Sequence, residues 1–372
     1  MGQPINKITL KGFKSIRCLE DFELEPVNVL IGANGCGKTN FVSFFKLLRE
    51  LIEGRLEKNI NKAGGADIHL YLGPKVTDRI EAELEFGVNG YKIVLEPTND
   101  NRLIFDDERI KYEGTKGYTL DVNRSIGSGQ SESKLKEQID KKTHSKAISE
   151  HIYSSVSSWV VYHFHDTSET AALRRTCSIR DTDRLRPDEA NLAPFLYWLK
   201  EEEEDTYDLI RDTVRLVAPF FDDFRLKPKK QKDDKALQLE WNQKGSDYPF
   251  HASQLSDGTL RFIALTTALL QPDPPATILI DEPELGLHPY ALDVLANLIL
   301  QAQDRTQIIV STQSAPLLNA FEPEHIVVIE RKEGESVFRR LTAGELTDWM
   351  TDDYTLSDLW QKNVYGGGPS HE

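Results

Sequence analysis

The chain has 372 residues and a formal net charge of −15 at pH 7, so it is long enough for one large domain with insertions or for two domains. A chain of this charge repels polyanions as a whole, and only local basic patches can attract them. Its three cysteines lack metal-ligand spacing and no apolar run reaches about 18 residues, which favours a cytoplasmic protein with reduced thiols that does not enter a membrane.

The first part of the chain predicts a strand, a glycine-rich loop and a helix in direct succession. Residues 27–31 predict a buried strand that leads into Gly32-Ala33-Asn34-Gly35-Cys36-Gly37-Lys38-Thr39, and apolar residues at helical spacing begin at Phe41. From about residue 66 to 120, apolar and charged residues alternate, which predicts antiparallel strands with one exposed face. Residues 124–147 are rich in Ser, Gly, Lys and Gln and predict a mobile loop or a solvated helix.

The remainder of the chain changes from irregular patterns to a regular alternation of helices and strands. Residues 159–165 predict a strand that is apolar on both faces, residues 191–221 predict helices, and residues 237–241 predict an alternating strand. After residue 255 the alternation of helices and strands predicts right-handed crossovers and a parallel sheet. The expected elements are a helix at 260–270, a strand at 277–281, a helix at 289–303 and strands at 307–312 and 325–330.

The glycine-rich segment matches the phosphate-binding pattern G-x-x-x-x-G-K-[ST]. Its glycines let consecutive backbone N–H groups surround a β-phosphate at the positive end of a helix. Lys38 can reach the β- and γ-phosphates of ATP, and the Thr39 hydroxyl can ligate Mg²⁺. The alternative is a chance glycine-rich turn, which the flanking strand and helix disfavour. The residues expected to contact ATP here are Gly32, Asn34, Gly35, Cys36, Gly37, Lys38, Thr39 and Asn40.

Two further segments carry chemistry. Asp281 and Glu282 end an apolar strand, where the first acid can hold Mg²⁺ together with Thr39. The second can orient and deprotonate the attacking water, so Glu282 is the expected general base; two exposed acids at a strand end are the alternative. Leu255-Ser256-Asp257-Gly258-Thr259 opens a helix upstream of these acids and, taken alone, is an ordinary helix cap.

The order of these segments, followed by Ser311-Thr312-Gln313-Ser314, resembles the RecF/SMC branch of the ABC-type ATPases. The chain is similar in particular to stand-alone bacterial AAA family ATPases related to RecF, and to the ATPase part of the OLD family. Three more strings fit this resemblance: Ile8–Ile16, Asp281–Pro289 and Leu359–Asn363.

The resemblance implies an α/β fold of the P-loop NTPase type: an ABC-type ATPase head with a mostly parallel core sheet, an antiparallel β subdomain and a helical insertion. It implies ATP and Mg²⁺ as cofactors, and a homodimer that forms on ATP binding. In such a dimer Ser256 and Gly258 bind the γ-phosphate held by the second subunit. Gln313 occupies the catalytic switch position.

The sequence departs from the family pattern at three places. The signature is Ser-Asp-Gly-Thr where Ser-Gly-Gly-Gln is commonest, although Ser256 and Gly258 remain. The switch residue, usually His, is Gln313, which cannot titrate near neutral pH. No glutamine stands out as a Q-loop, and the strand that carries His163, His165 and Asp166 is the candidate for its place. The two histidines share a strand face and are either metal ligands or, more commonly, a structural pair.

We expect three regions in the chain: residues 1–123, an ATPase lobe with the phosphate loop and the antiparallel sheet; residues 124–250, a lid-like insertion; and residues 251–372, a lobe with the signature, the acids and the switch. The middle region holds two basic clusters that acids dilute. They either contact DNA or a partner protein, or form a solvated surface with local ion pairs. The clusters are Arg174, Arg175, Arg180, Arg184 and Arg186, and then Lys227, Lys229, Lys230, Lys232 and Lys235.

The sequence therefore predicts a Mg²⁺-dependent ATPase that acts as a RecF-like switch in DNA repair or antiphage defence. It would control DNA binding or a separate effector protein, such as a nuclease or toxin. A nucleotide-binding subunit of a membrane ABC transporter is the alternative, disfavoured by the large insertion before Ser256 and by Glu284–His288. A non-hydrolysing structural head is a third hypothesis, disfavoured by the intact Lys38, Asp281 and Glu282.

Overall fold

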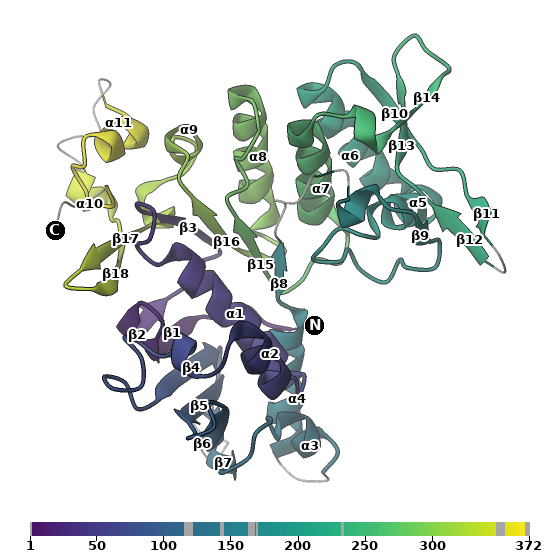
Figure 1. Ribbon diagram of the computed structural model, residues 1–372. Coiled ribbons are helices and arrows are strands. Elements are labelled where there is room, and N and C mark those ends of the chain that lie inside the picture. The colour runs from purple at the N-terminus through teal and green to yellow at the C-terminus, as the bar shows by residue number, and fades with distance from the viewer. Residues whose placement is uncertain are drawn as a thin grey trace.

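A computed structural model describes residues 2–114, 122–141, 145–162, 168, 170–231, 234–346 and 354–368. Two six-stranded sheets dominate this described part, and helix α1 (Lys38–Ile52) packs between them (Figure 1). One sheet is mostly parallel and the other is antiparallel.

The mostly parallel sheet has the strand order β18-β17-β3-β16-β15-β8, and only its edge strand β18 runs antiparallel to its neighbour. Asp281 lies beside Ser311, and Thr312 beside Ile31, so the carboxyl ends of the three central strands meet at one edge. The strands are β3 (Val27–Ile31), β8 (Val160–Tyr162), β15 (Thr277–Asp281), β16 (Gln307–Thr312), β17 (Ile326–Lys332) and β18 (Glu335–Arg340).

Both faces of the parallel sheet are buried, because each strand except the edge strand β18 divides its side chains between two hydrophobic cores. In β15, Ile278 and Ile280 belong to one core and Leu279 to the other. Helix α1 covers one face of the sheet. The helices that contribute to the core on the other face are α5 (Leu192–Glu202), α6 (Glu204–Val217), α7 (Asp257–Leu270), α8 (Pro289–Ala302), α9 (Ala315–Leu318), α10 (Ala343–Leu346) and α11 (Leu356–Gln361).

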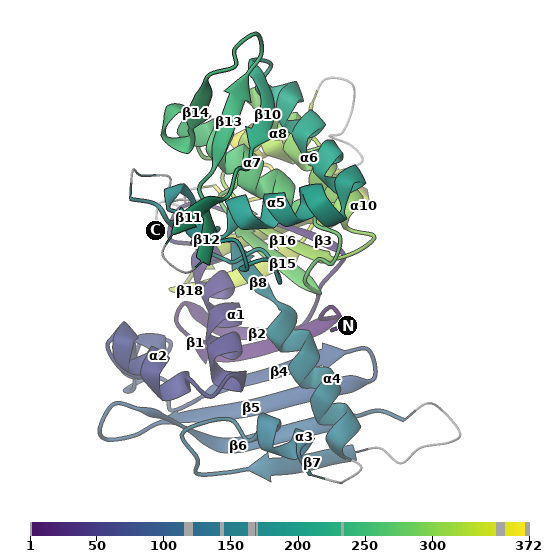
Figure 2. The same cartoon turned by 90° about the vertical axis from the view of Figure 1, so that its right-hand side faces the viewer.

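The antiparallel sheet has the order β2-β1-β4-β5-β6-β7, and Figure 2 shows α4 (Ser145–Ser158) lying across its strands. The apolar positions of β4 are buried and its glutamates are partly exposed, which confirms the alternation expected from the sequence. Helix α2 (Leu56–Ala63) packs on α1 and contacts β6. The strands are β1 (Lys7–Phe13), β2 (Ile16–Glu23), β4 (Ile80–Phe86), β5 (Asn89–Pro97), β6 (Leu103–Tyr112) and β7 (Val122–Gly127).

The expectation of a mobile loop or solvated helix at residues 124–147 is wrong for the residues that the structure describes there. Strand β7 pairs with β6, α3 (Leu135–Ile139) packs on α4, and the Leu135 side chain is fully buried. The polar residues of this stretch form specific bonds: the Glu132 carboxylate accepts the backbone N–H groups of Leu56 and Glu57 at 2.8 and 3.0 Å. The polar residues of this stretch thus include side chains that bond to other elements of the fold, and their composition did not indicate solvation. The boundary expected after residue 123 falls inside β7.

The described part of the insertion holds two small sheets as well as α5 and α6, at the right of Figure 1. The expected strand at 237–241 is interrupted, and its two halves belong to different sheets. The first sheet is formed by β10 (Phe221–Arg225), β13 (Glu240–Gln243) and β14 (Pro249–His251). The second is formed by β11 (Lys229–Gln231), β12 (Asp234–Leu237) and β9 (Cys177–Ser178).

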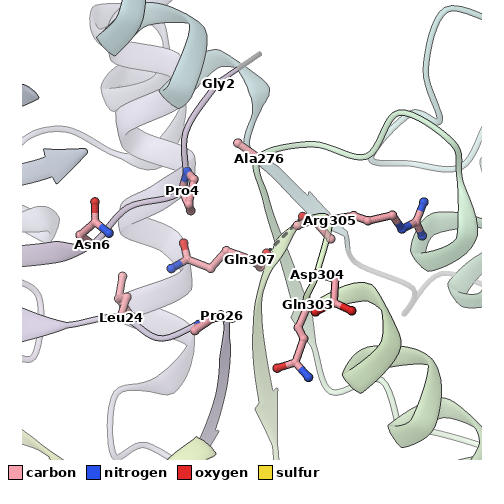
Figure 3. Close-up of a pocket in the computed structure, with 11 residues that line it drawn as sticks. Gly2, Pro4, Asn6, Leu24, Pro26, Ala276, Gln303, Asp304, Arg305 and Gln307 are labelled. Atoms are coloured by element: carbon pink, nitrogen blue, oxygen red, sulfur yellow. Dashed lines mark hydrogen bonds between the residues drawn. The ribbon is translucent and has the colours of Figure 1, made fainter. Parts of the chain in front are cut away.

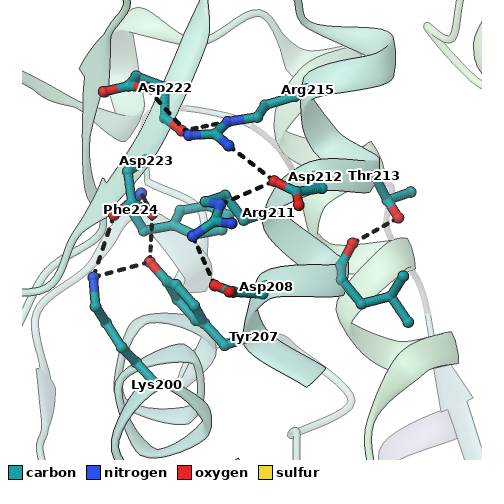
Figure 4. Close-up of polar contacts among 11 residues, drawn as sticks. Lys200, Tyr207, Asp208, Arg211, Asp212, Thr213, Arg215, Asp222, Asp223 and Phe224 are labelled. Atoms are coloured by element: carbon teal, nitrogen blue, oxygen red, sulfur yellow. Dashed lines mark hydrogen bonds and ion pairs between the residues drawn. The ribbon is translucent and has the colours of Figure 1, made fainter. Parts of the chain in front are cut away.

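A polar network joins the helices of the insertion to β10 (Figure 4). The Tyr207 hydroxyl of α6 donates to Asp223 Oδ1 at 2.6 Å, and Lys200 of α5 pairs with Asp223 Oδ2 at 3.3 Å. Arg215 of α6 pairs with Asp222 at 3.2 Å. These bonds link α5 and α6 to β10.

The N-terminal lobe contains a buried histidine in the short 3-10 helix η1 (Asp67–His69). The His69 ring stacks on Phe13 at 6.1 Å, neither ring nitrogen makes a hydrogen bond, and burial lowers its pKa from 6.5 to about 4. His69 therefore binds a proton near pH 6.5 in the unfolded chain, but only near pH 4 in the folded chain. Stability from this group is present at pH 7 and is lost as the pH falls.

We expect His69→Phe to remove that loss, because phenylalanine fills the same apolar space and does not titrate. Between pH 7 and pH 4 the free energy of unfolding should fall less in the variant, by on the order of 1–3 kcal/mol. Urea unfolding across this pH range measures the difference. An identical pH dependence in both proteins would contradict the assignment.

Candidate nucleotide site

The glycine-rich loop joins the end of β3 to the first turn of α1. Gly37 has φ +120°, a value that disfavours a side chain, and a Cβ there would collide with Ser336 Oγ. That hydroxyl donates to the carbonyl of Cys36 and accepts from Ser15 Oγ, which lies 2.7 Å away. Ser15 Oγ in turn accepts from Asn40 Nδ2 at 2.7 Å. Residues from β18 and the β1–β2 turn therefore hold the loop at the amino end of α1.

Lys38 lies inside this loop. Its ammonium group donates to the carbonyl oxygens of Gly32 and Ala33, and the residue is only 5% exposed. The two bonds fix the positive charge in the concave side of the loop, where backbone N–H groups at the helix start also favour anions. This arrangement suits the binding of a polyphosphate.

The Glu282 carboxylate faces the loop from the end of β15, which β16 separates from β3. Glu282 follows β15 with φ +45°, a left-handed conformation that is strained for a glutamate. Gln313 Nε2 donates to Glu282 Oε1 at 2.6 Å, and the backbone N–H of Gln313 donates to Glu284 Oε1 at 2.8 Å. The switch residue is thus bound to both glutamates, and it orients Glu282 with a group that does not titrate.

These parts enclose one cavity of about 120 Å³. Most of the residues expected from the sequence to contact ATP lie around this cavity, together with Glu282 and Gln313, which were expected to act in catalysis with Lys38. The cavity is lined by Asn34, Gly35, Gly37, Lys38, Thr39, Asn40, Glu282 and Gln313. The carboxyl edge of a parallel sheet is where open α/β folds bind ligands.

The same edge has a group suited to a divalent cation. Asp281 ends β15 and is 7% exposed, and its Oδ1 atom is buried without a hydrogen-bond partner. An unpartnered buried carboxylate oxygen is costly unless a cation or water satisfies it. Together with the hydroxyl of the exposed Thr39 at the cavity, it provides the hard oxygen ligands that Mg²⁺ prefers. Asp281 and Thr39 are the residues that would hold this ion.

Ser256 and Gly258 do not line this cavity. Ser256 is the N-cap of α7: its Oγ accepts the backbone N–H of Thr259 at 3.1 Å, and the residue is exposed. A Cβ on Gly258 would collide with the carbonyl oxygen of Gly286. The glycine in the signature is therefore required by packing within one chain, while Ser256 stays at the surface.

A second hollow of about 470 Å³ adjoins the first and shares Asn34 and Gln313 with it. Its other wall is the C-terminal segment with Trp360 and Asn363. A Cβ on Gly367 would lie 3.6 Å from Gly32 Cα, so this segment packs directly on the phosphate loop. The string Leu359–Asn363, noted in the sequence, thus borders the nucleotide site.

Another hollow, of about 280 Å³, lies at the amino edge of the parallel strands (Figure 3). Gln307 projects toward it and is tied to the N-terminal segment, because its side chain donates to the carbonyl of Ile5 and accepts the Ile5 N–H. Thr277 Oγ1 also donates to this side chain, at 3.1 Å. The hollow lies at the opposite edge from the phosphate loop. The bonds of Gln307 there attach the N-terminal segment to the sheet.

Sequence reasoning missed Ser15, Ser336 and Glu284. Ser15 stands in the Ile8–Ile16 string, and the second Glu in Asp281-Glu282-Pro283-Glu284 was a visible signal, but Ser336 gave none because a lone serine in a hairpin is unremarkable. The alternative to a Q-loop cannot be placed, since His163, His165 and Asp166 lie outside the described residues. Strand β8, which precedes them, is parallel to β15.

Comparison with known proteins places this arrangement in a family. The family described as "AAA domain, putative AbiEii toxin, Type IV TA system" matches residues 27–319. The chain belongs to this family. Among curated proteins, none matches the sequence.

Solved structures share its fold. The crystal structure of an SMC head bound to the C-winged helix domain of ScpA has a TM-score of 0.60 and 16% identity, over 93% of this chain and 99% of that one. An SMC head with an extended coiled coil, bound to the C-terminal domain of ScpA and derived from Pyrococcus furiosus, has a TM-score of 0.55 and 15% identity, over 93% and 98%. The RecF/SMC-branch, ABC-type fold expected from the sequence is confirmed.

The chain is an ATPase of the SMC/ABC-type P-loop class. Among its described residues, no helix has the length and apolar character needed to cross a membrane.

Glu284 yields a testable consequence of the geometry. Its Oε2 atom is buried, and burial raises the pKa of this carboxyl above its usual value. Glutamine keeps an oxygen that can accept the Gln313 N–H but carries no charge. We expect Glu284→Gln to raise the melting temperature at pH 8 by about 2 °C or more, because a buried charge is removed.

The gain should shrink toward pH 4.5, where Glu284 binds a proton and loses its own charge. Glu201→Gln, an exposed substitution on α5 with the same charge change, is the matched control and should have little effect at either pH. Thermal melts of the three proteins decide the matter. A Glu284→Gln protein less stable than the parent at pH 8 would show that the charge is needed.

Proposed function

We propose that this ATPase hydrolyses ATP with Mg²⁺, and that ATP binding drives two copies together as a switch. One observation carries the first half: Glu282, held by Gln313, and Lys38 face one cavity. Lys38 binds the β- and γ-phosphates, Asp281 and Thr39 hold Mg²⁺, and Glu282 deprotonates the attacking water. Gln313 positions Glu282 through its amide, so no histidine-linked step near neutral pH is needed.

The second half rests on the position of the signature segment. Ser256 is exposed and does not line the cavity of its own chain. A site completed by Ser256 and Gly258 of a second copy would bind the γ-phosphate from the opposite side. Two ATP molecules would then be sandwiched between two heads. The two SMC heads described above share this fold, and both were solved with a domain of ScpA bound, which makes a separate effector protein a reasonable partner.

We place this switch in RecF-like DNA repair or antiphage defence, where it controls DNA binding or a separate effector. The sequence resemblance to RecF and OLD proteins supports both settings, and the family description, which names a toxin of a toxin–antitoxin system, favours defence. The transporter alternative is less well supported: this fold is shared with SMC heads, and the insertion before Ser256 is large.

Replacing Glu282 by Gln should keep nucleotide binding and slow hydrolysis at least about a hundredfold, within the range for loss of a positioned general base. The amide oxygen of glutamine can still accept from Gln313, so the local geometry should persist. Phosphate release and ATP affinity, measured on the same protein, separate the two effects.

Lys38→Ala provides the contrast, because it removes the main charge opposite the phosphates and should abolish tight ATP binding itself. If Glu282→Gln slows turnover less than about threefold, the general base lies elsewhere. Unchanged affinity and turnover in Lys38→Ala would contradict the phosphate-loop assignment.

Introducing an arginine in place of Ser256 tests the composite site. The bulky side chain would fill the space meant for the γ-phosphate, so Ser256→Arg should leave ATP binding by the monomer intact yet abolish ATP-dependent dimerisation and hydrolysis together. Light scattering in the Glu282→Gln background, with and without ATP, measures dimerisation.

Mixing Ser256→Arg with Lys38→Ala subunits is the internal control, since the mixture can form at most one working composite site per heterodimer and should recover part of the activity. An ATP-driven dimer that forms equally well with and without the Ser256→Arg change would mean that this segment is only a helix cap.

A further inference from the structure

The two basic clusters, which are about fifty residues apart in the chain, flank or enter the strands of one small sheet, at the far right of Figure 1. Strand β12 is its middle strand: Lys235 is paired with Lys230 of β11, and Leu237 with Cys177 of β9. The backbone N–H of Ile179 donates to the Lys235 carbonyl at 3.1 Å, so the arginine-rich segment continues beside β12. The exposed cations of the two clusters are Arg175, Arg180, Arg184, Arg186, Lys227, Lys229, Lys230 and Lys235.

Among the described residues, acids pair with cations of this surface. Asp181 and Asp188 both contact Arg186, at 3.1 and 3.6 Å. Glu240, which is nearly buried, pairs with Lys229 at 2.6 Å.

Elsewhere on the sheet, like charges face each other. Lys230 and Lys235 stand directly opposite across two paired strands, an arrangement that destabilises a sheet. A polyanion on this face could contact both ammonium groups at once, because the strand pairing sets the two lysines side by side.

The surface around these cations also indicates which polyanion fits. Among the described residues of 174–186 and 227–235, no large apolar side chain is exposed. Protein interfaces depend on buried apolar and aromatic anchors, and single strands are bound by stacking bases on aromatic rings. Phosphate contacts along a duplex need neither, only lysine and arginine side chains.

We propose that the sheet β9-β11-β12, with the exposed lysines of β11 and β12 and the arginines next to β9, is a docking surface for the phosphate backbone of duplex DNA. This proposal rests on the proposed function in one respect, that the switch controls DNA binding, and it names the surface. Because the chain carries a net charge of −15, DNA binding requires a local basic surface such as this one.

The docking surface is joined to the signature segment by a nearly buried arginine. Arg174, whose side chain is 9% exposed, pairs with Asp257 at 3.0 Å and donates to the carbonyl of Ala252. Its own carbonyl accepts from Gln238 at the end of β12, at 3.1 Å. A dimer formed through Ser256 would therefore carry two such surfaces on one assembly, and two linked contacts bind one duplex more tightly than a single contact does.

The test replaces Lys227, Lys230 and Lys235 together by Glu and measures binding of a labelled duplex of about 30 base pairs by fluorescence anisotropy, without ATP and over a range of salt. We expect binding at least about tenfold weaker at about 0.1 M salt, and a salt slope smaller by about 0.9 for each phosphate that is no longer neutralised. The matched control is Lys58→Glu, Lys62→Glu and Lys75→Glu, three exposed lysines in the N-terminal lobe with the same change in net charge.

A control as weak as the triple variant would show that only net charge matters, and would overturn the proposal. So would undiminished binding by the triple variant, tighter binding of a single strand of the same length, or no binding of duplex by the parent. The milder Lys→Gln triple, checked by thermal melting, should weaken binding in the same direction and excludes misfolding as the cause.

ATP hydrolysis without DNA should be unchanged in both lysine triples, because none of these residues lies at the nucleotide cavity. If the parent protein does not dimerise when ATP is added, the proposed switch is refuted. The proposed docking surface is not, because it is tested without ATP. Binding measured without ATP therefore tests the surface independently. Repeating it with ATP in the Glu282→Gln background should tighten the parent's binding and not that of the Glu triple.

Discussion

The parallel pairing of β3, β15 and β16 is the constraint on which the rest of the structure depends. Because the register sets Asp281 beside Ser311 and Thr312 beside Ile31, the three strands end together. The phosphate loop, the two acids and Gln313 each lie at or directly after one of these strand ends. The strand register alone therefore brings them to one edge of the sheet. Burial of both sheet faces, one against α1 and the other against α7 and α8, holds that register.

The sequence predicted the core of this arrangement well, because the same residues carry both local and global signals. The strands at 27–31, 277–281 and 307–312 have the expected bounds, since apolar runs between glycine-rich or acidic turns leave little freedom. Most cavity residues followed from the phosphate-loop pattern, and Glu282 and Gln313 followed from the acidic strand end and the family resemblance. Ser336 and Glu284 did not, because their roles depend on a hairpin and a turn that approach the loop only after folding.

The insertion was the least predictable region, for a physical reason. Its strands are short, and polar residues there form specific long-range bonds, as Glu132 does with the start of α2. Composition alone cannot distinguish such bonds from solvation. The two basic clusters are the clearest case. Their spacing in the chain gave no sign that β12 would pair with both β9 and β11, and only this pairing placed Lys230 opposite Lys235.

The contact between Gly258 and Gly286 has a mechanical consequence. With no room for even one methyl group between the start of α7 and the turn that follows β15, neither segment can slide past the other. The start of the helix and the acidic strand must therefore move as one rigid lever. A small rotation of that unit would displace Ser256 and Glu282 at the same moment. In the proposed dimer, closure and the alignment of the attacking water would then be coupled.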